Sequence, residues 1–140
     1  SEKAVEQYRS RISGPLLDRI DMIIQVPAVH YEDLRRRKEA ESSAQIKERV
    51  DFARKQQHRR FGESRGMCNA RMGPNDLRYH CKLDDESHEL MKMAFETFGL
   101  TARSYDRILK VARTIADLDA CDRINSDHLA EAIRYRTINL

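Results

Sequence analysis

The sequence predicts an all-α fold, a bundle of four or five helices over roughly residues 41–140, preceded by a short helix-strand piece. Three observations lead to this prediction. Long stretches repeat apolar residues at the three- and four-residue spacing of a helix. Only five Gly and three Pro occur among 140 residues, which favours long helices with short connections over an all-β plan. Helix-capping residues stand where most of these stretches begin.

Length and composition fit one modest domain core. Charged residues make up 35% of the chain, hydrophobic residues 40%, and the net charge is +3. Disorder requires fewer apolar residues and a larger net charge. Three cysteines without a CxxC spacing indicate reduced thiols in a cytoplasmic protein. No apolar run reaches the roughly 20 residues that a membrane span needs, and no signal peptide is visible.

The first 40 residues are expected to be the C-terminal edge of a larger domain. Residues 1–12 can form a helix, which Gly14 ends, and Pro15 suits the first turn of another short helix. The run MIIQVP over 22–27 is typical of a strand stopped by proline. A single strand needs partners for its backbone groups, and this sequence predicts none. Because the chain also starts without Met, we expect a fragment whose residues 1–40 are poorly anchored.

Residues 41–140 form the second predicted domain. Ser42 and Gln45 match a capping box, so a helix is predicted over 43–60. Its inward face is traced by Ile46, Val50, Ala53 and Gln57. The following residues, 62–73, are predicted as a loop from their Gly and Asn content.

Two more helices follow the loop. Pro74 suits the first position of a short helix over 74–81. Asp84 is the predicted cap of the next helix, and Gly99 the residue that ends it. The apolar positions of that helix are Leu90, Met91, Ala94, Phe95 and Phe98.

Thr101 is the predicted cap of the longest amphipathic segment, and Ser126 the predicted cap of the last helix. His128 is read as a residue of the core edge or of the capping turn, not as a catalytic residue. The inward positions of these two helices are Tyr105, Ile108, Val111, Ala112, Ile115, Leu118, Leu129, Ala130 and Ile133.

Basic residues cluster near the end of the 43–60 helix, and two readings of them stay open. They can be a solvated helix face, or they can contact the phosphates of DNA. The DNA-binding candidates are Arg54, Lys55, Arg59 and Arg60. His80 beside Cys81 is weak support for a metal site, because no second pair of ligands accompanies it, and we expect no bound metal.

Three stretches together resemble a known family: YRSRISGPLLDRIDMIIQVP (8–27), ESSAQIKERVDFARKQQHRRF (41–61) and LTARSYDRILKVARTIADLDACDRI (100–124). They are similar to the C-terminal part of magnesium-chelatase-like AAA+ ATPases, in particular to the bacterial competence-associated branch, the competence protein M type. The resemblance extends over residues 4–136. It implies that residues 1–40 end the AAA+ core and that 41–140 are its helical lid.

The resemblance also implies what the parent protein does. It is expected to bind ATP and Mg²⁺, to assemble with neighbouring copies into a ring (a hexamer), and to drive branch migration of DNA during natural transformation. The sequence has no GxxxxGK[ST] loop for phosphates and no apolar strand ending in Asp-Glu to hold Mg²⁺. We therefore expect the chain alone to bind neither ATP nor Mg²⁺ and to be catalytically inactive.

Arg19 lies in PLLDRID, which is similar to the arginine-finger segment of these relatives. The resemblance implies that Arg19 reaches toward the γ-phosphate bound by the neighbouring subunit. A guanidinium is permanently charged and can contact two phosphate oxygens at once. The residues by themselves also allow a helix-end arginine paired with Asp18 or Asp21.

Arg103 in LTARSYDR matches the sensor-2 arginine of the same relatives, which contacts nucleotide phosphate. A cation is normally disfavoured in the first turn of a helix, so its presence there suggests an anionic ligand. The alternative is a surface arginine near Asp106 or Asp85. Arg107, one turn further on, is a second, weaker candidate for the nucleotide contact.

Two other functions remain open. The parent can be a chelatase-type motor that inserts metal through a partner, although the residues around Arg19, SGPLLDRID, are of the competence type. Alternatively, the chain can be a stand-alone helical module that binds nucleic acid through residues 35–60. That module would leave the 22–27 strand without a partner.

Overall fold

A computed structural model describes residues 16, 19–29, 31, 35, 40–62 and 66–137. In this part the chain forms five α-helices, one short 3₁₀ helix and no β-strand, which confirms the all-α prediction. The elements are α4 (Ser43–Phe61), η1 (Asn69–Arg71), α5 (Pro74–His80), α6 (Asp85–Phe98), α7 (Ala102–Leu118) and α8 (Ser126–Thr137). Among these described helices, none is both long and apolar enough to cross a membrane.

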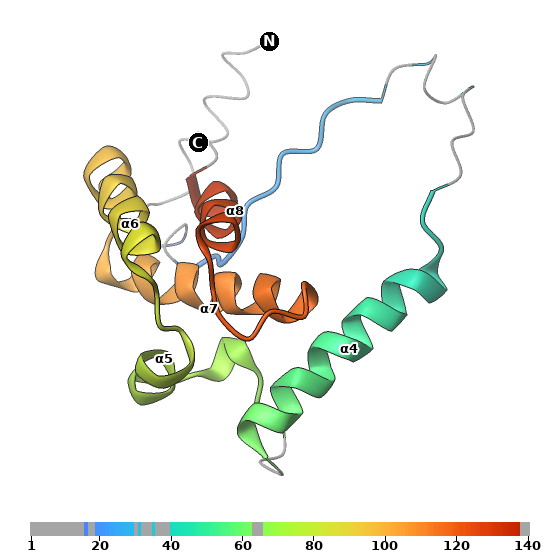
Figure 1. Cartoon of the computed structure of the whole chain (residues 1–140). Coiled ribbons are helices and arrows are strands. Elements are labelled where there is room, and N and C mark those ends of the chain that lie inside the picture. The colour runs from blue at the N-terminus through green and yellow to red at the C-terminus, as the bar shows by residue number, and fades with distance from the viewer. Residues whose placement is uncertain are drawn as a thin grey trace.

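Helix α7 is the centre of the bundle. Helices α4, α5 and α8 and the short η1 all pack against it, while α6 packs on α8. Figure 1 shows α7 crossing the middle of the molecule, with α6 and α8 on one side and α5 on the other. Small residues of α7 and α8 let these two helices approach closely. The most deeply buried apolar residues are Ile108, Ala112, Ala116, Leu129 and Ala132.

Three of the predicted helix starts are confirmed by their hydrogen bonds. Ser42 and Gln45 form the reciprocal capping box of α4. The Ser87 amide donates to the carboxylate of Asp84 at 2.8 Å, and the Ser104 amide donates to the Thr101 hydroxyl at 3.2 Å. Each contact satisfies an amide that has no partner inside its own helix.

Gly99 ends α6 as predicted. It adopts a left-handed conformation with φ of 59°, which glycine reaches without the steric cost that a Cβ imposes. Its amide donates to the carbonyl of Phe95 at 3.0 Å. The turn allows Thr101 to begin α7 two residues later.

The cap of the last helix differs from the prediction. Helix α8 already includes Ser126, and Asn125 is the residue that caps it. The His128 amide donates to the Asn125 side-chain oxygen at 3.0 Å, and Nδ1 of His128 accepts from the Asn125 amide at 3.2 Å. This reciprocal pair satisfies two backbone amides at once. His128 is therefore a capping-turn residue, as predicted, and it is also buried.

Some of the predicted inward positions face solvent instead. In α4, Ala53 and Gln57 are buried, but Ile46 is 45% exposed and Val50 46% exposed. The reason is that α7 covers only the C-terminal half of α4, and Figure 1 shows the N-terminal half extending beyond the bundle. The other inward predictions that prove exposed are Phe98, Leu118 and Ala130. Phe98 and Leu118 are the last residues of α6 and α7, whereas Ala130 lies within α8.

The strand predicted over 22–27 does not form. These residues run without regular secondary structure, and the described part of the chain contains no second strand to pair with them. An isolated strand cannot satisfy its backbone groups. Ile23 instead donates its amide to the carbonyl of Tyr135 in α8 at 2.8 Å. The helix predicted over 1–12 lies outside the described residues.

Candidate functional site

The arginine predicted to be a finger, Arg19, stands in a turn. Its amide donates to the carbonyl of Leu16 at 2.9 Å. The residue is exposed, and among the described residues its guanidinium has neither a hydrogen-bond nor an ion-pair partner. Asp21, one of the two carboxylates considered as its partner, pairs with Arg107 instead. Asp18, the other, lies outside the described residues.

Arg103 lies in the first turn of α7, two residues after the Thr101 cap. Its side chain is exposed and makes no hydrogen bond or ion pair within the described part of the chain. Neither Asp106 nor Asp85 pairs with it. An unpaired cation at a helix N-terminus lies beside partial positive charge from the helix dipole. An anion bound at this position would therefore relieve the repulsion.

Arg107 has partners that the sequence did not predict. Its guanidinium donates to the carbonyl oxygen of Arg19 at 2.8 Å and forms an ion pair with Asp21. The side chain is 23% exposed. Both contacts use Nη1, and a nucleotide contact by Arg107 stays a prediction.

Helix α8 contacts the same segment. Arg136 donates to the carbonyl of Ile20 and, at 3.2 Å, to the hydroxyl of Ser104 in α7. Together with the hydrogen bond from Ile23 to Tyr135, these contacts hold the segment 19–23 against both α7 and α8.

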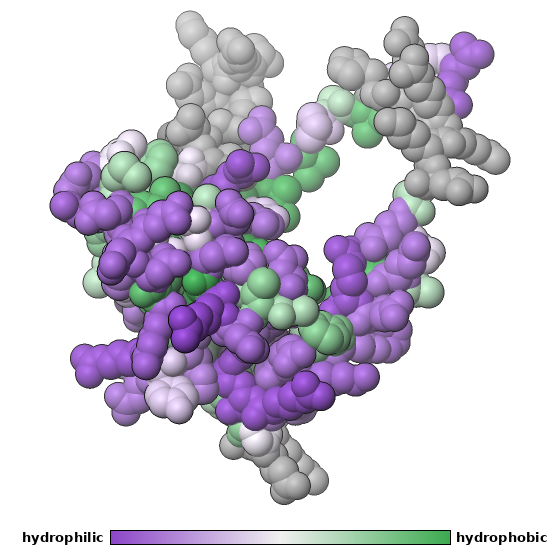
Figure 2. Space-filling view, in the orientation of Figure 1, coloured by the Kyte–Doolittle hydropathy of each residue, from purple (hydrophilic) through white to green (hydrophobic). Residues whose placement is uncertain are grey.

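The four basic residues of α4 separate into two groups. Arg54, Lys55 and Arg59 are exposed and have no ion-pair partner in the described part of the chain. Figure 2 shows hydrophilic side chains over most of the α4 surface in view. Arg60 differs, because its side chain is only 13% exposed and contacts other protein groups. Three of the four candidates are thus exposed without an ion-pair partner in the described part of the chain, and their contact with DNA stays a prediction.

Arg60 belongs to a buried polar network around Asp117, whose side chain is 1% exposed. The Arg60 guanidinium contacts both carboxylate oxygens of Asp117 and donates to the side-chain oxygen of Asn69 at 2.8 Å. Asn69 donates to Asp117 at 2.7 Å, and Arg113 donates to it from Nε at 3.1 Å. The network joins α4, η1 and α7.

The spacing of Arg113 and Asp117 on one helix could have suggested their pairing, since oppositely charged residues four apart lie on one face. No signal in the sequence indicated that Arg60 pairs with Asp117. It is 57 positions from Asp117, and its pairing depends on how α4 and α7 come together.

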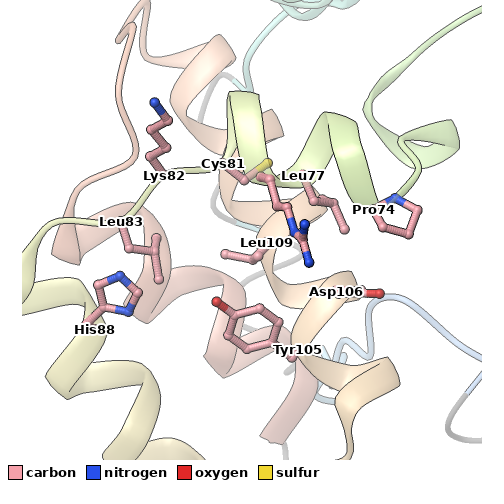
Figure 3. A pocket seen from close by; sticks show the side chains of 10 residues that line it. Pro74, Leu77, Cys81, Lys82, Leu83, His88, Tyr105, Asp106 and Leu109 are labelled. Atoms are coloured by element: carbon pink, nitrogen blue, oxygen red, sulfur yellow. The ribbon is translucent and has the colours of Figure 1, made fainter.

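A cavity of about 520 Å³ lies between α5, α6 and α7. Figure 3 shows Tyr105 and Leu109 of α7 on one side of it, and His88 of α6 and Leu77 of α5 on the others. Neither Arg19, Arg103 nor Arg107 lines it. The cavity is therefore separate from the predicted phosphate contacts.

His80 and Cys81 take structural positions. The His80 ring packs edge-on against Phe61 with 5.7 Å between ring centroids, and burial together with the Arg60 charge lowers its pKa. Burial raises the pKa of the Cys81 thiol to about 12. Within the described residues, no group of three or more His, Cys, Asp or Glu side chains is placed to hold a metal ion.

Family comparisons identify what this bundle is. The family model described as magnesium chelatase, subunit ChlI C-terminal, matches residues 40–136. The model described as magnesium chelatase, subunit ChlI, matches residues 1–34. Since the first match covers most of the sequence, the chain belongs to the ChlI C-terminal family. The helical bundle is therefore the AAA+ lid region of a ChlI-type protein.

Individual relatives agree with this assignment. The chain is 39% identical over 139 residues to the Competence protein ComM of Haemophilus influenzae. It is 39% identical over 134 residues to the uncharacterized protein YifB of Escherichia coli, and 28% identical over 130 residues to an uncharacterized protein of Mycobacterium tuberculosis. These alignments cover 99%, 95% and 93% of this chain but 26% of each relative. The predicted resemblance is confirmed, and the chain spans about a quarter of the length of these relatives.

Proposed function

We propose that this chain is the lid region of an ATP-driven ring motor that acts on DNA and promotes branch migration during natural transformation. Membership of the ChlI C-terminal family and the similarity to a competence protein support the proposal. In it, the chain continues from a nucleotide-binding AAA+ core, and several copies, six in the simplest case, form a ring. We call the protein that joins core and lid the complete ATPase.

The observation that carries the proposal is the pair of exposed arginines without a partner in the described residues, Arg19 and Arg103. Arg107 and Arg136, from the same part of the bundle, contact protein acceptors. Arg19 acts as the finger on the nucleotide of the neighbouring copy, where its charge offsets the charge that develops on the transferred phosphoryl group. Arg103 acts as the sensor that contacts nucleotide phosphate and moves the lid with nucleotide state.

The complete ATPase uses ATP and Mg²⁺. The described residues of this chain are suited to contact the phosphates of ATP but not to hold Mg²⁺. Two unpaired guanidinium groups suit phosphate oxygens, whereas the described residues offer no cluster of carboxylates for a metal. The lid thus supplies phosphate contacts, and the core supplies the phosphate loop and the Mg²⁺ ligands.

The test is ATP turnover by the complete ATPase, with and without branched DNA. We expect turnover that DNA stimulates. Arg19→Ala should abolish turnover but leave ATP binding intact, because its target lies in the next copy; removal of an arginine finger costs about 10³–10⁵-fold in kcat. Arg103→Ala should weaken ATP binding or turnover. Arg134→Ala, an exposed arginine of α8, is the matched control and should behave as wild type.

Other outcomes would contradict particular parts of the proposal. Full activity in Arg19→Ala would remove the finger, and unchanged kinetics in Arg103→Ala would remove the sensor. Turnover that ignores DNA would favour a chelatase-type motor that inserts metal through a partner, which the family description also suggests.

A further inference from the structure

The residues that follow Arg19 are held by side chains from two helices of the lid. We call residues 19–23 the strap. Within the strap, the carbonyl of Arg19 accepts from Arg107, and the carbonyl of Ile20 accepts from Arg136. The amide of Ile23 donates to the carbonyl of Tyr135 at 2.8 Å. Each successive contact comes from a helix of the bundle, so the lid fixes the path of the strap.

Arg107 makes the most specific of these contacts. One nitrogen of its guanidinium, Nη1, meets both the Arg19 carbonyl and the Asp21 carboxylate. The planar, charged guanidinium can donate several hydrogen bonds in fixed directions. Its partners lie 88 and 86 positions away in the sequence. The contact therefore closes a long loop of chain onto one point of α7.

Arg107 also lies next to the predicted sensor. Arg103 and Arg107 are four positions apart on α7, which places them on one face of the helix. The backbone of Arg19 is attached to the second of these residues. Helix α7 therefore carries Arg103 and also holds the backbone of Arg19 through Arg107.

We propose that Arg107 is a positioning residue for Arg19. It holds the strap on α7, so that a movement of the lid carries Arg19 with it toward or away from the neighbouring nucleotide. Arg136 supports the strap from α8. This role rests on the proposed function for its consequence in turnover, whereas its structural part, the attachment of the strap, stands on the chain alone.

The first experiment measures the attachment directly, by amide hydrogen exchange of the 140-residue chain followed by NMR. In the wild type, the Ile23 amide should be protected because it donates to Tyr135. Arg107→Ala should reduce this protection at least about tenfold, since local opening becomes easier once the anchoring side chain is removed. Arg134→Ala is the matched control, an exposed arginine of α8, and should leave the protection unchanged. Combining Arg107→Glu with Asp21→Arg should restore part of the protection that Arg107→Glu alone removes.

The second experiment measures turnover by the complete ATPase. Arg107→Ala should lower kcat at least about tenfold while KM for ATP stays within about twofold of wild type, because a mispositioned finger affects the reacting state and not ground-state binding. The charge exchange between Arg107 and Asp21 should recover part of kcat. A contact that merely stabilised the fold would not separate kcat from KM in this way.

Several results would overturn the role. Unchanged Ile23 protection in Arg107→Ala would show that this arginine does not hold the strap. A raised KM for ATP with an unchanged kcat would show that Arg107 binds nucleotide itself. Suppose that Arg107→Ala loses the Ile23 protection but keeps full turnover, while Arg19→Ala has no turnover. This result would show that the finger does not depend on the strap. Full turnover in both variants would contradict the finger of the proposed function and, with it, the positioning of Arg19.

Discussion

At the scale of single residues, Asp117 is a buried charge that joins α4, η1 and α7. Its carboxylate is almost fully buried and contacts Arg60, Arg113 and Asn69. Arg113 is itself 2% exposed at its side chain and donates further hydrogen bonds to the carbonyls of Cys121 and Asp122. A buried charge is tolerated when its partners compensate for the lost hydration. The loop between α7 and α8 is fixed by the same guanidinium.

We predict that Asp117→Asn destabilises the chain by at least about 3 kcal/mol, because it leaves the buried charges of two arginines without a counter-ion. Urea unfolding of the wild type and variant measures this. Asp122→Asn, the same substitution at an exposed loop residue of the same region, should change the free energy of unfolding by less than about 0.5 kcal/mol. Similar losses in the two variants would show that the network adds little.

The cysteines should differ in reactivity. Cys81 is buried and its pKa is raised to about 12, whereas Cys121 is exposed. The thiolate is the reactive form, so at a pH of about 9 iodoacetamide should modify Cys121 in the folded chain and leave Cys81 intact. Both should react in urea. Mass spectrometry of the digested protein measures the two sites, and rapid native modification of Cys81 would contradict its burial.

The same shift has a consequence for stability against pH. The folded pKa of Cys81 lies above the reference value of 9.0. The unfolded chain therefore loses this proton first as pH rises. The contribution of Cys81 to the free energy of unfolding is full below about pH 9 and is lost progressively as pH approaches 12. Tyr105 and Tyr135 have raised pKa values as well, and they act in the same direction.

At the scale of elements, four described helices, α4, α6, α7 and α8, begin with side-chain caps. The cap of α8 was assigned to the wrong residue from sequence. Ser126 and Asn125 are both good capping residues, and they are adjacent. The reciprocal contact with His128 decides between them, because the Asn125 oxygen reaches the amide three residues on. His128 is also within 3.2 Å of Asp119, so the same ring meets the residue that ends α7.

The two capping candidates can be separated by mutation. Asn125→Ala should lower the free energy of unfolding by about 1 kcal/mol, the usual cost of losing an N-cap. Ser126→Ala should change it by less than about 0.5 kcal/mol. Chemical denaturation of both variants measures the difference. A larger loss in Ser126→Ala would return the cap to that residue.

Helix α4 is attached to the bundle at one end only. Ala53 is buried in the C-terminal half. Gln57 accepts from the amide of Asn69 at 3.3 Å, and Arg60 contacts Asp117, so the contacts concentrate in that half. The first turns carry the exposed Ile46 and Val50. The basic side chains Lys55 and Arg59 lie near the attached end, where the bundle holds their helix in place.

At the scale of the whole molecule, the choice between a motor's lid and a stand-alone DNA-binding module can be tested on this chain. The net charge is only +3. Among the exposed cations of α4, Lys47 and Arg49 pair with carboxylates, so the three DNA-binding candidates without an ion-pair partner are a small electrostatic footprint. We predict weak binding to duplex DNA, with Kd of about 10⁻⁴–10⁻⁶ M near physiological salt, as for non-specific contacts.

The measurement is a titration at two salt concentrations. Lys55→Glu with Arg59→Glu should weaken the binding and reduce the salt slope by about one for each phosphate that the chain no longer neutralises. Lys92→Glu, an exposed lysine of α6, is the control and should have a smaller effect. Tight binding with a steep slope in the wild-type chain would instead support the stand-alone module.

The helices and most of their ends could be predicted from the sequence alone, because they depend on contacts between residues three or four positions apart. The caps Ser42, Asp84 and Thr101 could be predicted for this reason, as could Gly99 at the end of α6. Arg19 and Arg103 were selected because the motifs around them resemble those of the family, and their phosphate contacts stay predictions.

Which charges are paired and which are exposed was settled by the packing of the bundle. Arg60 and Asp117, or Arg107 and Asp21, are similar to many other charged residues when read along the chain, and their pairing depends on how distant segments come together. The same holds for the run over 22–27. Its residues favour a strand, but a strand exists only where another lies beside it. Local propensity depends on neighbouring residues, whereas burial and pairing are properties of the packed bundle.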